Sequence, residues 1–393
     1  MATATLPPGS LQRLDGMEGS RGAWRLTRVM KTTNIYQGAA APAVAGHQSR
    51  SVPLAIKLGL DMHLERYVVV AQEGHEIPKP ARRPEQFVPW VERLLGQGHP
   101  VFVVYEACGF GFGLCRRLEA LGARCYVIAP RKLDEQGKQV KTDPLDAGAL
   151  CQRLSRYVDG NRKELAVIRI PTEKEERARQ VHRQREALVR ARTKLQAQGR
   201  ALLLTHAQPA LPRWWHGQGW AALGKLLPDW LRARLEVFRP VLAALDGQIA
   251  ALTVELEKAA PEKLPVGLGK LTSVVVSREI CDWYRFKNRG QISSYTGLCP
   301  GEYSSGAKRL PGRVTKHGNP RLRSALVELA WRLVRFQPNY PPVQKRIAVL
   351  AAGARATGAA RKKAIVAVAR QLAVDLWRLH TRQCTAQRLG FTN

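Results

Sequence analysis

The first third of the chain alternates between a strand pattern and a helix pattern of hydrophobic positions. From Leu54 onward, "LAIKLGLD" and "RYVVVAQE" are short runs rich in apolar and β-branched residues, separated by a polar turn, and together they predict a β-hairpin. "PVFVVYEACG" predicts a third strand, "GFGLCRRLEALG" an amphipathic helix that ends at a glycine, and "ARCYVIAP" a fourth strand. Strands that alternate with helices are typical of an α/β domain.

The middle of the chain has helical periodicity. A further helix is predicted in "DPLDAGALCQRLSR", and Pro171 separates it from a long charged helix over about residues 172 to 205. A seven-residue repeat in this helix, and alternating steps of four and three further on, predict an antiparallel coiled-coil arm whose helices are joined through "QPALPRWWHGQGW". Pro240 is expected to kink or restart the second helix. The repeats are Val181, Leu188, Leu195 and Leu202, followed by Leu231, Leu235, Phe238, Leu242, Leu245, Ile249, Leu252 and Leu256.

The remaining segments complete a fold class of α/β plus α. After Pro261, helices are predicted over residues 321 to 334 and 361 to 379, so the C-terminal half is expected to be mainly helical. Residues 1 to 52 lack periodicity and mix small residues with scattered charges, which predicts a disordered extension. The expected boundaries are 53 to 160 for the α/β domain, 161 to 262 for the arm, 263 to 383 for the C-terminal domain and 384 to 393 for a tail.

Charge narrows the class of partner. The 393 residues include 63 Lys and Arg against 31 Asp and Glu, a formal charge of +32. Such an imbalance is best tolerated beside a polyanion, so nucleic acid is the expected partner. We expect no membrane partner, because no continuous apolar run reaches the length needed to span a bilayer. The seven cysteines form no C-x-x-C pair, which suggests neither zinc nor a disulfide framework and fits the reducing cytosol.

Four acids are candidates for a metal site. Asp61 closes the first predicted strand and Glu106 the third, so both can emerge at the carboxyl edge of the sheet, where open α/β sheets place their sites. Asp143 and Asp146 lie three residues apart at the start of a helix and face the same way. Carboxylates are the ligands that Mg²⁺ prefers. Taken alone, "TDPLDAG" is also explained by helix capping by Asp143 and a favourable dipole contact of Asp146, and it is the joint placement with Asp61 and Glu106 that favours a metal site.

A basic, glycine-rich segment is the second candidate site. Ser304 and Ser305 precede Gly306, so a hydroxyl there could attack a phosphorus, although serine-glycine pairs usually form turns. His317 is either a base or polar loop filler. Between Tyr303 and Arg323 the segment contains no acid. Its basic residues, which are suited to phosphate contacts, are Lys308, Arg309, Arg313, Lys316, Arg321 and Arg323.

Two further segments have two interpretations each. Gly267 and Gly269 in "VGLGK" fit either a hairpin whose backbone amides hold a phosphate or an ordinary turn between helices. Trp214, Trp215 and Trp220, near the tip of the arm, could stack on bases or pack between protomers.

Taken together, these segments resemble the DEDD transposases of the insertion-sequence 110 family. "GLDMH", "YEACG" and "VKTDPLDAGAL" resemble the family's N-terminal motifs, and "RFKNRGQISSYTGLCPGEYSSGAKRLPGRVTKHGNPRLRSALVELAW" resembles its C-terminal transposase domain without interruption. The resemblance covers about residues 54 to 379. It implies a RuvC-like (RNase H-like) N-terminal domain, a helical coiled-coil arm and a mainly helical C-terminal transposase domain.

The resemblance also assigns roles. It implies that Asp61, Glu106, Asp143 and Asp146 bind Mg²⁺ and that a serine attacks DNA to form a covalent phosphoserine link. Ser305 is the expected nucleophile because it adjoins Gly306, with Ser304 as the fallback. The implied partners are donor and target DNA, a structured non-coding guide RNA, and other copies of the chain in a homodimer or homotetramer. The implied location is the cytoplasm of a bacterium or archaeon, at the nucleoid.

We therefore expect a site-specific DNA recombinase of an insertion sequence. One alternative is a RuvC-like endonuclease that cuts by metal-activated water, for which the acids are essential and the serines dispensable. The other is a catalytically inactive nucleic-acid-binding protein, for which neither set is needed.

Overall fold

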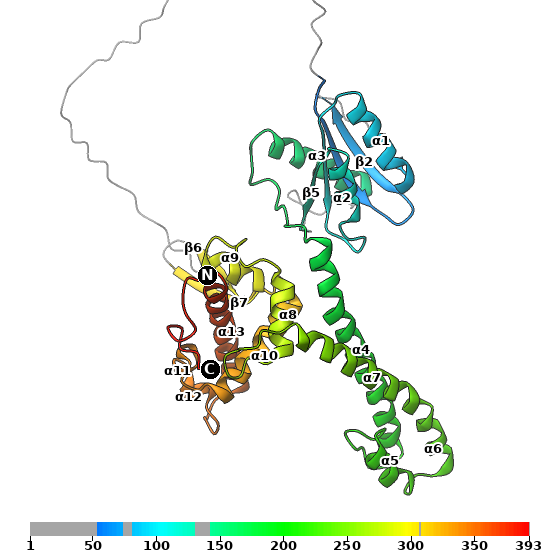
Figure 1. Ribbon diagram of the computed structural model, residues 1–393, viewed down its shortest axis with the longest axis vertical. Helices are drawn as coiled ribbons and strands as arrows, with labels where there is room; N and C mark the ends of the chain where they lie inside the picture. The colour runs from blue at the N-terminus through cyan, green and yellow to red at the C-terminus, as the bar shows by residue number, and fades with distance from the viewer. Residues whose placement is uncertain (1–52, 74–80, 130–141, 306–307, 393) are drawn as a thin grey trace, which may run out of the picture. The chain divides into compact units, whose positions relative to one another are not determined.

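The computed structural model describes residues 53–73, 81–129, 142–305 and 308–392, drawn as ribbon in Figure 1. The expected extension over residues 1 to 52 lies outside the described residues. The elements fall into an N-terminal α/β region, a pair of long helices and a C-terminal helical region, which agrees with the predicted α/β plus α class.

The α/β region is built on a mixed sheet in the order β3-β2-β1-β4-β5. β1 pairs antiparallel with β2, which confirms the predicted hairpin, and it pairs in parallel with β4, as β4 does with β5. β3 was not predicted from the sequence. The bounds are Ile56–Met62 for β1, Tyr67–Glu73 for β2, Ala81–Arg82 for β3, Val101–Glu106 for β4 and Arg124–Ile128 for β5.

Helices cover both faces of this sheet because its central strands are apolar on both sides. α1 (Pro84–Gly96) and α2 (Gly113–Ala120) pack on the face that carries Leu58 and Leu60 of β1. α3 (Asp143–Val158) packs on the opposite face, against Val104 of β4. A Cβ at Gly59 would lie 2.2 Å from the carbonyl oxygen of Ala147, so this glycine allows the α3 backbone to approach β1 closely. α1 was not predicted from the sequence.

The predicted long helix is confirmed as α4 (Glu173–Thr205). It begins with a capping box: the Glu175 amide donates to the Thr172 hydroxyl over 3.2 Å, and the Thr172 amide donates to the Glu175 carboxylate over 2.8 Å. Because these bonds satisfy two amides that a helix start leaves without partners, they fix where α4 begins. Three helices follow, namely α5 (Gly217–Gly224), α6 (Asp229–Glu236) and α7 (Phe238–Lys258).

α7 runs back along α4. Leu242, Ile249 and Leu256 are buried at every seventh position, whereas Leu245 and Leu252 between them are only half-buried. Polar side chains flank this seam, because Arg192 of α4 forms an ion pair with Asp246 at 2.8 Å and Arg185 donates to Thr253 over 2.7 Å. Arg185 lies seven residues before Arg192 on α4, whereas Thr253 lies seven residues after Asp246 on α7, so the two helices are antiparallel. Pro240 lies in the first turn of α7, and the helix restarts at Phe238.

Two of the three tryptophans near the arm tip, Trp214 and Trp215, serve neither of the predicted uses. Trp214 is completely buried and Trp215 is 6% exposed, within a cluster that includes Leu203 of α4. A Cβ at Gly199 would lie 2.0 Å from the Trp214 ring, so the glycine makes room for the indole. Burial inside their own chain leaves Trp214 and Trp215 available neither for stacking on bases nor for packing between protomers.

The arm also qualifies the expectation about membranes. The segment Asp229–Lys258, which spans α6 and α7, is long and apolar enough to cross a bilayer by length and composition. It carries Asp246, which accepts from Arg192 and from the indole of Trp215 at 3.0 Å. A helix whose apolar seam and acid are both engaged by α4 has a structural use inside the protein, so this length is weak evidence for a span.

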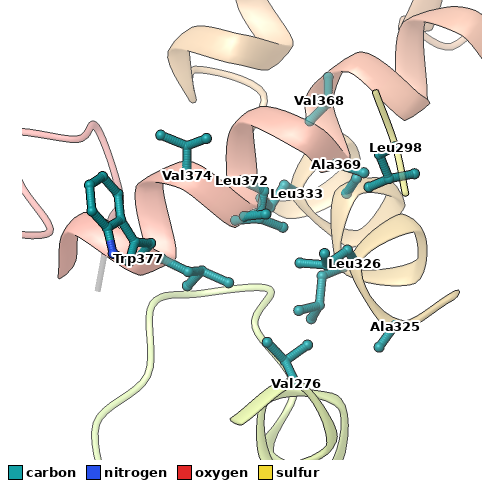
Figure 2. Close-up of a cluster of buried hydrophobic side chains, with 14 of the residues drawn as sticks. Val276, Leu298, Ala325, Leu326, Leu333, Val368, Ala369, Leu372, Val374 and Trp377 are labelled. Carbon is teal, nitrogen blue, oxygen red and sulfur yellow. The ribbon is translucent and has the colours of Figure 1, made fainter. Parts of the chain in front are cut away.

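The C-terminal region is a helical bundle around α10 and α13, whose predicted helices are confirmed. Figure 2 shows Leu333 of α10 beside Leu372 of α13, and Leu326 and Val368 belong to the same buried cluster. A β-hairpin that the sequence analysis took for a loop joins α9 to α10. The bounds are α8 Lys270–Ile280, α9 Arg289–Thr296, β6 Pro300–Ser305, β7 Lys308–Val314, α10 Pro320–Phe336, α11 Pro341–Gln344, α12 Ile347–Leu350 and α13 Gly358–His380.

Candidate active site

Two of the predicted acids lie side by side at the carboxyl ends of neighbouring strands. The parallel register of β1 and β4 pairs Leu60 with Tyr105, and Asp61 and Glu106 are the next residues on each strand. Side chains alternate between the faces of a strand. Because Gly59 and Val104 face α3, Asp61 and Glu106, two residues further on, emerge on that same face.

The start of α3 brings a third acid to this edge. Asp143 is the first residue of α3, and its Oδ2 lies 3.3 Å from Nε2 of His63. The same Nε2 lies 3.3 Å from Oδ2 of Asp61, so the imidazole bridges the two carboxylates. The capping interpretation of Asp143 was wrong, because the N-cap residue is Thr142 and Asp143 follows it inside the helix.

His63 is a candidate site residue that the sequence analysis missed. It ends the quoted segment "GLDMH", and only its position two residues after Asp61 could have indicated it. Ligand atoms of Asp61, His63 and Asp143 all lie within 4.8 Å of one another, and the three side chains are part-exposed. Arg66 adds a cation 3.5 Å from Asp143. Two hard carboxylate oxygens and one imidazole nitrogen are a donor set that a divalent cation can use.

Glu106 and Asp146 complete the predicted set by position. Both are half-buried on the α3 side of the sheet's carboxyl edge, Glu106 at the end of β4 and Asp146 in the first turn of α3. The close group of possible metal ligands found within the described ranges contains neither of them. The structure therefore gathers Asp61 and Asp143 tightly, and brings the other two acids to the same edge.

The two serines belong to a strand. Ser304 and Ser305 are the last residues of β6, and the antiparallel register sets them opposite Arg309 and Lys308 of β7. The side chains of these four residues lie outside the part of the structure that is described. Tyr303, the residue before them, is 76% exposed, so β6 ends at the protein surface.

The described basic side chains of β7 and of the segment after it divide into two groups. Arg313 and Lys316 are exposed. Arg321 instead forms an ion pair with Glu186 of α4, and Arg323 donates to the carbonyl oxygen of Lys316 over 3.2 Å. Arg321 and Arg323 thus have structural partners in the free chain, which the sequence analysis did not foresee.

The glycine pair of "VGLGK" packs on α10. Gly267 has a φ of +84°, and its carbonyl oxygen accepts from Arg332 over 2.8 Å, while Gly269 is the N-cap residue of α8. The preceding helix, α7, ends at Lys258, so the pair does not directly join two successive helices. This geometry uses Gly267 for packing, and binding of a phosphate by the pair stays a prediction.

Comparisons with known proteins give consistent matches. A model of the transposase IS116/IS110/IS902 family matches residues 265–343. The chain is 31% identical over 316 residues to putative transposase y4rJ of Sinorhizobium fredii, an alignment that covers 72% of this chain and 78% of that protein. It is 30% identical over 301 residues to the transposase for insertion sequence element IS1111A of Coxiella burnetii, covering 72% and 78%. It is 26% identical over 294 residues to the transposase for insertion sequence element IS1328 of Yersinia enterocolitica, covering 71% and 84%.

Proposed function

The chain belongs to the IS116/IS110/IS902 family of transposases, and we propose that it recombines DNA through a covalent phosphoserine intermediate at a site that also uses a divalent metal. It is an enzyme that cleaves and rejoins DNA. The observation that carries the proposed mechanism is the convergence of Asp61, His63 and Asp143 at one edge of the sheet.

We assign the α/β region to a RuvC-like catalytic domain over residues 53 to 160. The assignment is supported by the mixed strand order β3-β2-β1-β4-β5 and by the acids at the ends of β1 and β4 and at the start of α3. Asp61, Glu106, Asp143 and Asp146 would hold Mg²⁺, which when bound supplies positive charge to the phosphate under attack. His63 would hold the carboxylates of Asp61 and Asp143 in position to bind the metal.

The nucleophile that we assign is Ser305, with Ser304 as the alternative. Its hydroxyl oxygen forms a bond to phosphorus, the bond between phosphorus and the sugar oxygen of the strand breaks, and the departing oxygen gains the proton that the hydroxyl loses. The exposed cations Arg313 and Lys316 would contact the phosphate backbone nearby. Because the phosphoester bond is kept on the protein, attack by a new strand end can rejoin DNA without ATP.

Joined products distinguish this mechanism from the alternatives. In a cell-based excision assay with DNA carrying the element's ends, we expect rejoined flanking DNA. Hydrolysed, unjoined ends would instead identify the metal-water endonuclease, and unchanged DNA would identify the inactive binding protein.

We assign the C-terminal region and the arm to nucleic-acid binding and to pairing of copies. After Trp283 the acids are Glu302, Glu328 and the buried Asp375, so the C-terminal surface is strongly basic. The half-buried Leu245 and Leu252 leave part of the α4–α7 seam open to a second arm, as in a coiled coil. The partners would be DNA, a structured guide RNA and one or three further copies in the bacterial or archaeal cytoplasm.

Salt tests the electrostatic part of this assignment. If six to ten phosphates are contacted, the affinity for DNA or RNA should fall roughly 10³ to 10⁵ fold between 50 and 200 mM salt, because each contact releases counterions. Fluorescence anisotropy with a labelled duplex and a labelled RNA hairpin measures this slope. A nearly flat slope would contradict backbone binding by the basic surface.

A further inference from the structure

Glu279 of α8 carries a completely buried carboxylate at the junction of α8 with α4. Nε2 of His182 lies 2.7 Å from its Oε1. Arg183 donates to both oxygens, over 3.0 and 2.9 Å. Asn319 donates its Nδ2 to Oε2 over 2.6 Å. Groups from α4 and from the start of α10 therefore meet on one carboxylate.

These partners keep Glu279 ionised. Burial by itself would raise the pKa of the carboxyl, but the hydrogen bonds from His182, Arg183 and Asn319 hold the pKa of Glu279 far below its ordinary value. The charged Glu279 in turn raises the pKa of Arg183. A buried ion pair is weak evidence for stability, because removing two charges from water offsets most of their attraction. The Glu279 cluster is therefore better explained by the positions in which it holds its partners than by a gain in stability.

Asn319 uses both ends of its side chain. Its Oδ1 accepts from the amides of Arg321 and Leu322 over 3.0 and 3.2 Å, which caps α10, while its Nδ2 is bound to Glu279. The backbone amide of Asn319 also donates to the carbonyl of Tyr295 over 3.2 Å. The residue that ends the loop between β7 and α10 is thus held on α8 and α9.

The loop between β7 and α10, residues 315–319, packs closely against α9 and is bonded to the segment that leads into β6. A Cβ at Gly318 would lie 2.4 Å from the carbonyl oxygen of Tyr295, so the two backbones are in direct contact. The amides of Thr315 and Lys316 donate to the carbonyls of Cys299 and Gly297, over 2.9 and 3.2 Å. These bonds continue the pairing at the open end of the β6–β7 hairpin.

The arm helix holds the other side of the cluster. His182 and Arg183 bind Glu279 from α4, and Glu186, one turn further along α4, pairs with Arg321 in the first turn of α10. The chain of contacts therefore runs from α4 through Glu279 to Asn319, and from Asn319 through the loop to the hairpin that carries Ser304 and Ser305.

We propose that Glu279 is a positioning residue that sets the β6–β7 hairpin relative to the arm helix by holding Asn319. The proposal rests on the serine mechanism proposed above. Its consequence is kinetic: the link orients the serine hairpin for attack and contributes little to holding DNA. A misplacement of about 1 Å can slow an oriented reaction on the order of 10²-fold.

The test separates this link from the helix cap that Asn319 also provides. In Asn319→Asp the carboxylate still caps α10 but faces Glu279 with a like charge. In Glu279→Gln one of the two acceptor oxygens becomes an amide donor, so the side chain can no longer accept from His182, Arg183 and Asn319 together. We expect each variant to form the protein–DNA adduct at least about tenfold more slowly in single-turnover assays. DNA affinity should stay within about twofold, because the phosphate contacts are untouched. Thermal unfolding checks that both variants fold.

The double variant Glu279→Gln with Asn319→Asp exchanges the amide and the carboxylate, so the hydrogen bond can re-form with reversed polarity, and we expect most of the rate to return. Asn288→Asp is the matched control, because Asn288 caps α9 through its amide oxygen and has no carboxylate partner among the hydrogen bonds found in the described chain. Wild-type rates in both single variants, loss of DNA binding in parallel with rate, or no rescue in the double variant would each overturn the proposal. A wild-type protein that forms no adduct would refute the serine mechanism instead.

Discussion

Replacement of Ser305 by alanine should abolish the covalent protein–DNA adduct and leave DNA binding intact. Removing the hydroxyl removes the oxygen atom that bonds to phosphorus, so no adduct can form at this residue. DNA binding should persist because the phosphate contacts come from basic side chains such as Arg313 and Lys316. A denaturing gel of protein incubated with labelled DNA and RNA that copurifies with the protein measures the adduct, and anisotropy measures binding.

Ser304→Ala is the control for this experiment, since Ser304 is the neighbouring residue on β6. We expect it to retain the adduct. Loss of the adduct in Ser304→Ala alone would transfer the nucleophile to Ser304. An undiminished adduct in the double variant would exclude both serines as the nucleophile. Cleavage by the wild-type protein without any adduct would instead indicate the hydrolytic mechanism, in which only the acids are required.

Asp143→Asn should lower the rate of strand cleavage by about 10² to 10³ fold, the range seen when one group that stabilises transition-state charge is removed. The carboxylate of Asp143 lies 3.3 Å from His63, which also contacts Asp61, so the change removes charge from the tightest part of the candidate metal site. Cleavage of labelled DNA under single-turnover conditions, across a titration of Mg²⁺, measures the effect. A higher Mg²⁺ requirement would accompany the slower rate.

Asp159→Asn makes the same change just beyond the far end of α3. Asp159 is largely exposed and pairs with Lys57, which also donates to Ser155 over 2.8 Å and so keeps a partner. Because Asp159 lies away from the candidate metal site, this variant should cleave normally. Equal losses in both variants would indicate a general effect on α3. Full activity in Asp143→Asn would remove this acid from the site.

Local signals predicted the elements that depend on neighbouring residues. The hairpin of β1 and β2, the long helix α4 and the helices α10 and α13 follow from periodicity and from turn or capping residues, all within one segment. The β6–β7 hairpin was missed because its strands contain Pro, Gly and Lys, which have low strand propensity, and its pairing compensates for that.

The site was only partly accessible to such signals. Acids at the ends of strands and at a helix start could be selected as candidates, because parallel strands end at a common edge. His63 carried no comparable signal, since a single histidine beside a turn is common. The tryptophans of the arm show the opposite error: aromatic residues near a helix tip resemble a binding surface, but Gly199 provides the space that buries Trp214.

By itself, the amino-acid sequence determined the longest helices and the strands β1, β2, β4 and β5, the charge that calls for a nucleic-acid partner, and the family, because each of these is carried by composition or by contiguous residues. Only the tertiary structure decided that His63 joins Asp61 and Asp143, and that Glu279 receives side chains from α4 and α10. Such contacts join residues that are as many as 97 positions apart, as for His182 and Glu279. They depend on how whole elements pack, through close approaches such as that of α3 at Gly59. A local sequence pattern does not encode which distant residues such packing brings into contact.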